Sequence, residues 1–185
     1  QDVAIVRIEG MIYGFVLEAM QRQVDRAMDA GASVIVFHMD TPGGEVTAAI
    51  DIAKYIKSLP VPTVAWINDQ AYSAGILIAS ACDEIIMSPS SNTGVSAPVS
   101  GGGQNIDSDM KEKVLAVLLS EFRDNARSNG YHYSLLHAMV EMGVQVYLIE
   151  HPETGERHLV NQVDYAFMVE GKDPEAGNLL RGTCG

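Results

Sequence analysis

The chain has 185 residues, of which 47% are hydrophobic and 19% charged. This length suits one compact domain, and the apolar fraction suffices for a packed core. The formal net charge of −12 argues against partners such as nucleic acid or an anionic membrane surface. No apolar run reaches the roughly 18 residues of a membrane span, and no signal peptide is visible. Two cysteines are too few for a disulfide framework and lack zinc-binding spacing.

The first half of the chain alternates strand-like and helix-like segments. The predicted strands are apolar and rich in β-branched residues, whereas the predicted helices carry apolar residues at helical spacing. In chain order they are the strand Val3–Ile8, the helix Gly14–Ala30, the strand Ser33–Met39, the helix Val46–Ser58, the strand Val61–Ile67, a small-residue helix opening at Ser73, and the strand Glu84–Met87. Repeated strand–helix–strand units predict right-handed crossovers and a largely parallel sheet in an α/β fold.

A long loop separates this first half from a helical segment. Ser88–Gln104 is dense in glycine, serine and proline, so we expect no regular element there, and loops of this length are usually functional or mobile. Asp109 then begins a helix as its N-cap, with Glu112 completing a capping box, and this helix is expected to end near Asn129.

The remaining segments predict a helical pair and a β-hairpin at the C-terminus. A second helix is expected over Ser134–Met142, followed by hairpin strands at Val144–Glu150 and Arg157–Asn161. We expect a single domain over residues 1–169 and a flexible tail over residues 170–185, which are polar and rich in glycine.

Ser73 lies where a buried strand is predicted to pass through a polar turn into a helix that begins Ser-Ala-Gly. Backbone N–H groups at a helix start have no intrahelical acceptor and can bind the oxyanion of an acyl-transfer intermediate. The alternative is that Ser73 is simply a helix N-cap. The Gly43-Gly44 loop follows a neighbouring strand, and sites in such folds lie at the carboxyl ends of the strands. This convergence favours a catalytic serine.

The identity of a base for Ser73 is less clear from the residues. His38 is the only histidine that the predicted topology places near the site, and a partly buried structural role is the more common one for such a residue. The other four histidines lie on late helices and the hairpin, so none has a clear triad setting. They are His132, His137, His151 and His158.

A lysine base is the alternative, because a neutral, desolvated amine can accept a serine proton. Lys54 and Lys57 are predicted to lie on an exposed helix face, and Lys172 lies in the tail. Lys111 and Lys113 remain, directly after the long loop. Helical periodicity alone slightly favours Lys111, which lies over the apolar stripe of its helix, although both could be solvated.

Two motifs carry a resemblance to a known family. The loop Asp40–Gly44 reads Asp-Thr-Pro-Gly-Gly after a strand, and Ser73–Gly75 opens a later helix. Together they resemble the Clp-protease/signal-peptide-peptidase-A superfamily. A loop like Thr93–Val99, a glycine-rich stretch and a Lys-Val helix start are closer to its membrane-bound NfeD-type branch. The similarity covers about Val3 to Gly130.

This resemblance implies a role for each matching residue. Ser73 matches the nucleophile, and Lys113, which Val114 follows, matches the general base, with Lys111 as the runner-up. The backbone N–H groups of Gly44 and Ala74 match the oxyanion donors, and Gly43 beside them is expected to contact an extended substrate.

The implied fold is Clp-protease/crotonase-like, and the implied activity is that of a serine endopeptidase with a Ser-Lys dyad. Substrates are expected to be hydrophobic peptides, such as signal peptides or membrane-protein segments, with no cofactor and no metal. Homo-oligomers are expected, with Met11–Tyr13 as one exposed apolar stretch that could pair. The resemblance also implies the soluble domain of a membrane protein, on the extracytoplasmic face of the membrane or in a periplasm-like compartment.

Two other function classes stay open. A crotonase-like enzyme acting on acyl thioesters would share the oxyanion donors but would need no Ser-Lys dyad. A catalytically silent scaffold of a membrane-associated complex is the second, because the sequence departs from the family after the lysine helix. Gly130-Tyr131-His132 replaces a Gly-Arg-Asn-like turn, and Gly143–Val146 only loosely matches the segment that follows.

Overall fold

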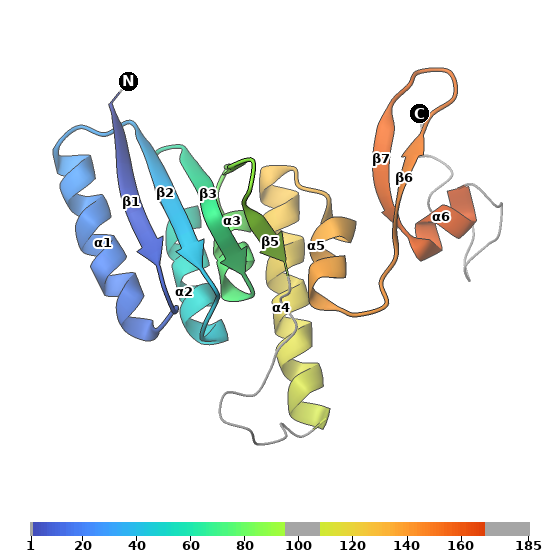
Figure 1. The fold of residues 1–185 in the computed structure, drawn as a ribbon, viewed down its shortest axis with the longest axis horizontal. Helices are drawn as coiled ribbons and strands as arrows, with labels where there is room; N and C mark the ends of the chain where they lie inside the picture. The colour runs from blue at the N-terminus through green and yellow to red at the C-terminus, as the bar shows by residue number, and fades with distance from the viewer. Residues whose placement is uncertain (1, 95–107, 169–185) are drawn as a thin grey trace.

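A computed structural model describes residues 2–94 and 108–168 of the chain, and its centre is a parallel β-sheet (Figure 1). Four strands lie side by side in chain order, and a short fifth strand extends the sheet beside the end of β3. They are β1 (Val3–Glu9), β2 (Val34–Thr41), β3 (Thr63–Tyr72), β4 (Glu84–Met87) and β5 (Asn92–Gly94). All described pairings in this sheet are parallel, as the alternating sequence pattern predicts.

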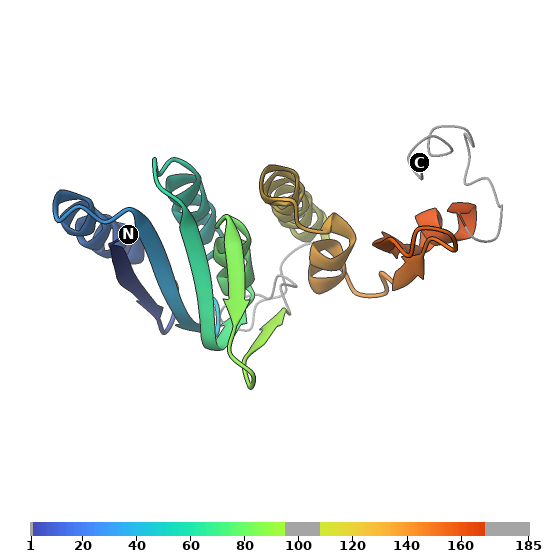
Figure 2. The same cartoon turned by 90° about the horizontal axis from the view of Figure 1, so that it is seen from above.

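The helices that connect the strands cover one face of the sheet, as Figure 2 shows. They are α1 (Gly14–Asp29), α2 (Val46–Lys57) and α3 (Ala74–Ser80), and α4 (Ser108–Asn129) and α5 (Tyr133–Val140) follow beyond α3. The predicted α/β architecture is therefore confirmed. The helix bounds differ from the predicted ones by no more than a residue or two.

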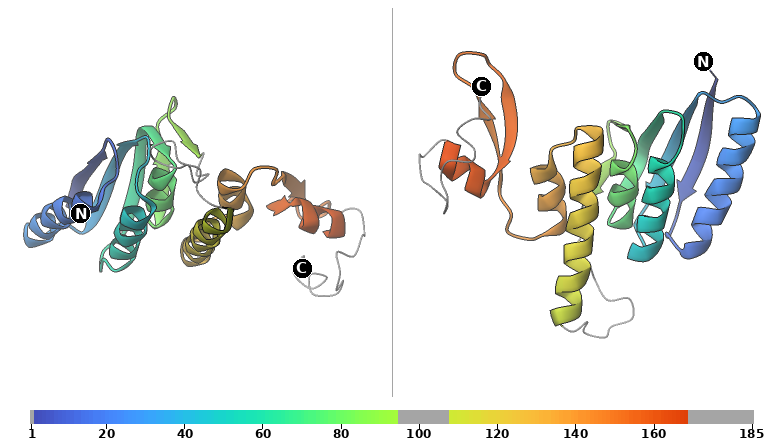
Figure 3. Two further views of the ribbon diagram at one scale, coloured as in Figure 1. Left: turned by 90° about the horizontal axis from the view of Figure 1, so that it is seen from below. Right: turned by 180° about the vertical axis from the view of Figure 1, so that it is seen from behind.

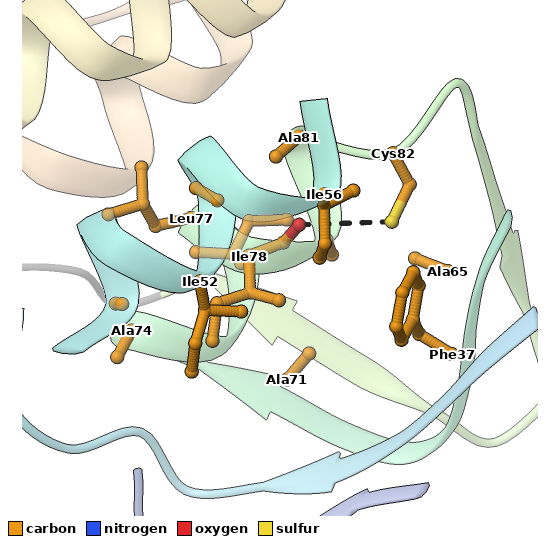
Figure 4. Packing of buried hydrophobic residues seen from close by; sticks show 14 of the residues in the cluster. Phe37, Ile52, Ile56, Ala65, Ala71, Ala74, Leu77, Ile78, Ala81 and Cys82 are labelled. Carbon is orange, nitrogen blue, oxygen red and sulfur yellow. Dashed lines mark hydrogen bonds between the residues drawn. The ribbon is translucent and has the colours of Figure 1, made fainter. Parts of the chain in front are cut away.

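The hydrophobic core lies between the covered face of the sheet and these helices. Every second residue of β2 points into it and is fully buried, including Phe37. Ile52 and Ile56 of α2 and Ile78 of α3 close over that face (Figure 4). Burying each of these large side chains contributes about 1.5–3 kcal/mol to folding. Cys82 is buried at the edge of this cluster, and burial raises the pKa of its thiol.

The strand β3 is longer than predicted. We expected a strand over Val61–Ile67 and a polar turn after it, but β3 continues to Tyr72. The extra residues are held by tertiary pairing, because Ala71 pairs with Thr41 of β2 and Gln70–Tyr72 pair with β5. Local polarity therefore gives the wrong prediction here, since backbone partners on both sides outweigh side-chain preference. The predicted loop is likewise interrupted by β5 at its start.

The C-terminal half of α4 is fastened to the end of α3. Asn125 is fully buried, and its Nδ2 donates hydrogen bonds to Leu77 O (3.3 Å) and Ser80 Oγ (2.9 Å). Asn129 Nδ2 donates to Ser80 O (3.0 Å) and Cys82 O (2.9 Å). These amides add to the hydrogen bonds at the buried end of α3, where Leu77 O also accepts from Ser80 Oγ and Cys82 O from Tyr131 Oη. The first turns of α4, in contrast to its C-terminal half, extend past the end of the sheet (Figure 1).

The C-terminal arm, which we define as residues 141–168, projects from the body beyond α5 (Figures 1 and 3). The predicted hairpin is confirmed as β6 (Val146–Glu150) paired antiparallel with β7 (Arg157–Asn161). A short helix that the sequence does not predict, α6 (Gln162–Met168), packs on it through stacking of Tyr147 and Tyr165 with ring centroids 4.2 Å apart. Among the described helices, none is long and apolar enough to cross a membrane.

Ion pairs of Lys57 join α2 to α4, so the prediction that Lys57 lies on an exposed helix face is wrong. Lys57 does not lie on a freely exposed face: its Nζ contacts Asp124 Oδ2 at 2.7 Å and Glu121 Oε2 at 3.6 Å. The hydrogen bond from Lys57 and its positive charge lower the pKa of Asp124. The side chain of Asp124 is 61% exposed, so the pair contributes only about 0.2–1 kcal/mol.

This pair makes stability depend on pH. Because the pKa of Asp124 is lower in the folded state, the contribution is present above about pH 4, the pKa of an unperturbed aspartate, and is lost as pH falls through the folded value. In urea unfolding, Lys57→Met is expected to be less stable than the parent at pH 7 and to differ less from it near pH 2. Lys54→Met, on an exposed residue of the same helix, should show neither effect. A Lys57→Met deficit that does not change with pH would contradict this account.

Candidate active site

Ser73 lies at the junction of β3 and α3 in a strained backbone conformation. With φ at 50° and ψ at −115°, it is the one non-glycine residue with positive φ among the described residues. Such a conformation costs about 1–3 kcal/mol and persists only where the surroundings enforce it. Ser73 holds the N-cap position, yet its side chain makes no capping hydrogen bond to α3. The simple N-cap interpretation therefore does not account for this serine.

The glycine loop after β2 touches Ser73. Gly43 has a φ of 109°, and a Cβ at this position would lie 2.7 Å from Ser73 Cβ and 2.9 Å from Tyr72 O. Only glycine allows both this backbone conformation and this contact. The structure thus brings together the two loops that the topology places at the same edge of the sheet. Gly43 lies directly against the backbone that carries Ser73.

Gly44 is fixed from its other side by Ile12. Ile12 N donates to Gly43 O and Glu45 N donates to Ile12 O, each at 2.9 Å, which makes a parallel bridge around Gly44. Successive residues of an extended segment direct their N–H groups to opposite sides, so the Gly44 N–H points away from Ile12. Ile12 is fully buried, which corrects the expectation that it shares an exposed stretch with Met11 and Tyr13.

Ala74 supplies the second predicted oxyanion donor. It is the first residue of α3, where a backbone N–H has no intrahelical acceptor. Its nitrogen would lie 3.3 Å from a Cβ on Gly43, so the start of the helix and the glycine loop are adjacent. Backbone N–H groups beside a serine are the donors that oxyanion stabilisation uses, and the roles of Gly44 and Ala74 as such donors stay predictions.

Gly94 is a site residue that the sequence analysis misses. Its carbonyl oxygen in β5 accepts a hydrogen bond from Ser73 N at 3.0 Å, so the nucleophile candidate is held at its backbone by the loop strand. Thr93 Oγ1 donates to Ala71 O at 2.8 Å and ties the same strand to β3. The Thr-Gly pair is visible in the sequence, but its pairing partner is not.

The two lysine candidates lie near the start of α4. Lys113 is exposed, and the Lys111 side chain lies outside the described part of the structure, as do residues 95–107 of the long loop. The pairing of either lysine with Ser73 therefore stays a prediction. Residues 170–185, the expected tail, also lie outside the described residues.

His38 has a structural setting. It lies on the face of β2 opposite the helices, with its ring edge against Trp66 at a centroid distance of 4.8 Å. Its Nδ1 lies 3.4 Å from Glu9 Oε1, which is an ion-pair distance without hydrogen-bond geometry. These contacts agree with a partly buried structural histidine. Within residues 2–94 and 108–168, no three His, Cys, Asp or Glu side chains gather as they would around a metal ion.

Comparison with known proteins gives a consistent set of relatives. The family model described as the NfeD1b N-terminal domain matches residues 2–172. The membrane protein NfeD1b of Bacillus subtilis is 31% identical over 179 residues, which is 97% of this chain and 40% of that protein. The membrane-bound protease PH1510 of Pyrococcus horikoshii is 29% identical over 106 residues, or 56% of this chain and 24% of that protein. The chain spans less than half the length of either relative.

Solved structures share the fold. A serine-to-alanine variant of the 1510-N membrane-bound stomatin-specific protease superposes with a TM-score of 0.68 at 23% identity, covering 75% of this chain and 69% of that one. A lysine-to-alanine variant of 1510-N in complex with a substrate peptide gives a TM-score of 0.68 at 22% identity, covering 75% and 65%. At this level of identity the likeness establishes the fold, which confirms the Clp-protease-like prediction.

Proposed function

Because this chain belongs to the NfeD1b N-terminal domain family, we propose that it is a serine endopeptidase domain with a Ser-Lys dyad. The observation that carries the proposal is the contact of the Gly43 backbone with Ser73 at a strained strand–helix junction. Strain of this kind is retained where it orients a reacting group. The names of relatives that are membrane-bound proteases support the same reaction class.

In the proposed mechanism, Lys113 in its neutral form accepts the proton from Ser73 Oγ, which attacks a peptide carbonyl carbon. The Gly44 and Ala74 N–H groups stabilise the negative charge on the carbonyl oxygen. The leaving amine takes the proton from Lys113, and water then hydrolyses the acyl-enzyme by the same proton route. The chain's own residues suffice for each step, so the mechanism uses no cofactor.

The proposed substrates are peptides with apolar side chains, such as signal peptides or membrane-protein segments. Met11, Tyr13 and Phe15 are exposed on either side of the Ile12 bridge to Gly44, and the Tyr13 and Phe15 rings stack at 5.7 Å. These side chains form an apolar rim beside the glycine loop. An extended peptide along that loop would place its own apolar side chains on the rim.

We further propose that the dyad works in a homo-oligomer. Lys113 is exposed in the single chain, whereas a lysine base needs desolvation to lose its proton near neutral pH. Met110 and Val117, three residues before and four after Lys113, are 55% and 48% exposed on the same helix face. A second copy that covers this apolar face would bury the amine. We also propose that the domain works on the extracytoplasmic face of a membrane or in a periplasm-like compartment, and the names of relatives that are membrane proteins support the membrane association.

The test is labelling of Ser73 by a fluorophosphonate probe at several pH values, because a lysine base accepts a proton only in its neutral form. Labelling is expected in the parent and in Lys111→Ala, and its loss is expected in Ser73→Ala and Lys113→Ala. Ser58→Ala, at the end of α2, is the matched control and should label normally.

Each contrary outcome selects another interpretation. Loss of labelling in Lys111→Ala, with retention in Lys113→Ala, would identify Lys111 as the base instead of Lys113. A parent protein that is folded and assembled but does not label would support the catalytically silent scaffold. In that case Ser73→Ala should leave partner binding unchanged. Retention of coenzyme A on purification without labelling would support the acyl-thioester enzyme.

A further inference from the structure

Thr41, the threonine of the Asp-Thr-Pro-Gly-Gly loop, is fully buried at the end of β2. Its Oγ1 donates a hydrogen bond to Gly10 O at 2.6 Å and accepts one from Gly43 N at 3.1 Å. Gly43 O lies farther from the same hydroxyl, at 3.5 Å. One side chain therefore joins the loop that follows β1 to the glycine loop that follows β2.

The methyl group of Thr41 has a separate contact. A Cβ on Gly75 would lie 2.7 Å from Thr41 Cγ2, so the methyl packs against the second residue of α3, two positions after Ser73. The hydroxyl and the methyl thus act on different segments. The hydroxyl holds the glycine loop, and the methyl supports the helix that follows the serine.

We propose that Thr41 is a positioning residue whose hydroxyl holds the peptide between Pro42 and Gly43, and through it the next peptide, which carries the Gly44 N–H, relative to Ser73. This inference rests on the proposed function, because it concerns the aim of the Gly44 N–H at the oxyanion. Ile12 N holds the carbonyl of the Gly43–Gly44 peptide, but Gly43 has no side chain and a φ of 109°, so its own conformational preferences do little to hold the peptide before it. The hydrogen bond from Gly43 N to Thr41 Oγ1 limits rotation of the segment just before the donor.

Two variants separate the contacts of Thr41. Thr41→Val keeps the shape and the methyl but removes the hydroxyl, leaving Gly10 O and Gly43 N without this partner. Thr41→Ser keeps the hydroxyl and removes the methyl. Thr63→Val is the matched control, because buried Thr63 Oγ1 also donates one hydrogen bond and accepts one, both with Asp83, at the opposite end of the strands.

The readout is the saturating rate and half-saturating concentration of fluorophosphonate labelling, measured with the melting temperature. Thr41→Val is expected to lower the saturating rate about 10- to 100-fold, with the half-saturating concentration changed less than about threefold. Thr41→Ser should stay within about threefold of the parental rate, although it melts at a lower temperature. Thr63→Val should melt lower and label at the parental rate.

Labelling of Thr41→Val at the parental rate, or equal loss in Thr41→Ser, would overturn the positioning role. A parent that is folded but never labels would count against the proposed function instead. In that case amide hydrogen exchange decides on Thr41 alone: faster exchange at Ile12, whose N–H donates to Gly43 O, is expected in Thr41→Val but not in Thr41→Ser. Equal protection of Ile12 in all three proteins would overturn the inference.

Discussion

Replacing Gly44 with alanine is expected to abolish labelling of Ser73 and to lower the free energy of unfolding by about 2–4 kcal/mol. The added Cβ would lie 2.1 Å from Ile12 O and 2.6 Å from Ile12 N, and backbone atoms cannot move aside as the end of a side chain can. The bridge to Ile12 must open, which breaks its two backbone hydrogen bonds. The oxyanion donor then moves with the loop.

Urea unfolding and probe labelling measure the two effects. Gly14→Ala is the matched control, since Gly14 is the first residue of α1 and has open space around its Cβ position. It should label normally and be as stable as the parent or more stable by up to about 1 kcal/mol. Parental stability and labelling in Gly44→Ala would show that the bridge around Gly44 is not a constraint in solution.

Phe122→Ala is expected to cost about 3–5 kcal/mol of unfolding free energy, the range for removing a fully buried aromatic ring. Phe122 is 0% exposed and lies on α4 one turn before Asn125, where the helix is fastened to α3. The cavity left by the ring would weaken the packing of α4, the helix that carries Lys113, so the labelling rate of Ser73 should fall as well.

Val117→Ala provides the comparison within the same helix. Val117 is 48% exposed in the single chain, so its truncation should change the unfolding free energy of the monomer by no more than about 0.5 kcal/mol. Denaturant unfolding of both variants, followed by circular dichroism, gives the two values. A Phe122→Ala cost as small as that of Val117→Ala would mean that α4 is not held by this contact.

Much of the fold can be predicted from the sequence because its strands and helices have strong periodic patterns. Buried residues alternate along β2 and recur at helical spacing along α2. The bounds of both elements are therefore close to the predicted ones. The end of β3 is different. Asn68–Tyr72 is polar, and it is a strand only because Thr41 and β5 supply backbone partners that no local pattern reveals.

The site is predictable to the extent that topology determines it. Parallel strands deliver Gly43 and Ser73 to one edge of the sheet, and the structure has them in contact. The roles of Gly94 and Thr41 depend on hydrogen bonds across loops, and a sequence does not give loop geometry. The sequence wrongly predicts Ile12 as exposed, because its neighbours Met11 and Tyr13 are exposed and the bridge to Gly44 that buries Ile12 is not visible in the sequence.

The seating of α4 has a mechanical consequence. Leu118 is the first buried residue of α4 after Lys113, so the helix between them, about 7.5 Å long, projects beyond the buried core. A tilt of about 10° in this projecting segment would displace Lys113 by about 1.3 Å, which is enough to make or break a proton-transfer contact. The start of α4 can therefore move a base by this amount while Phe122 and Asn125 stay in place.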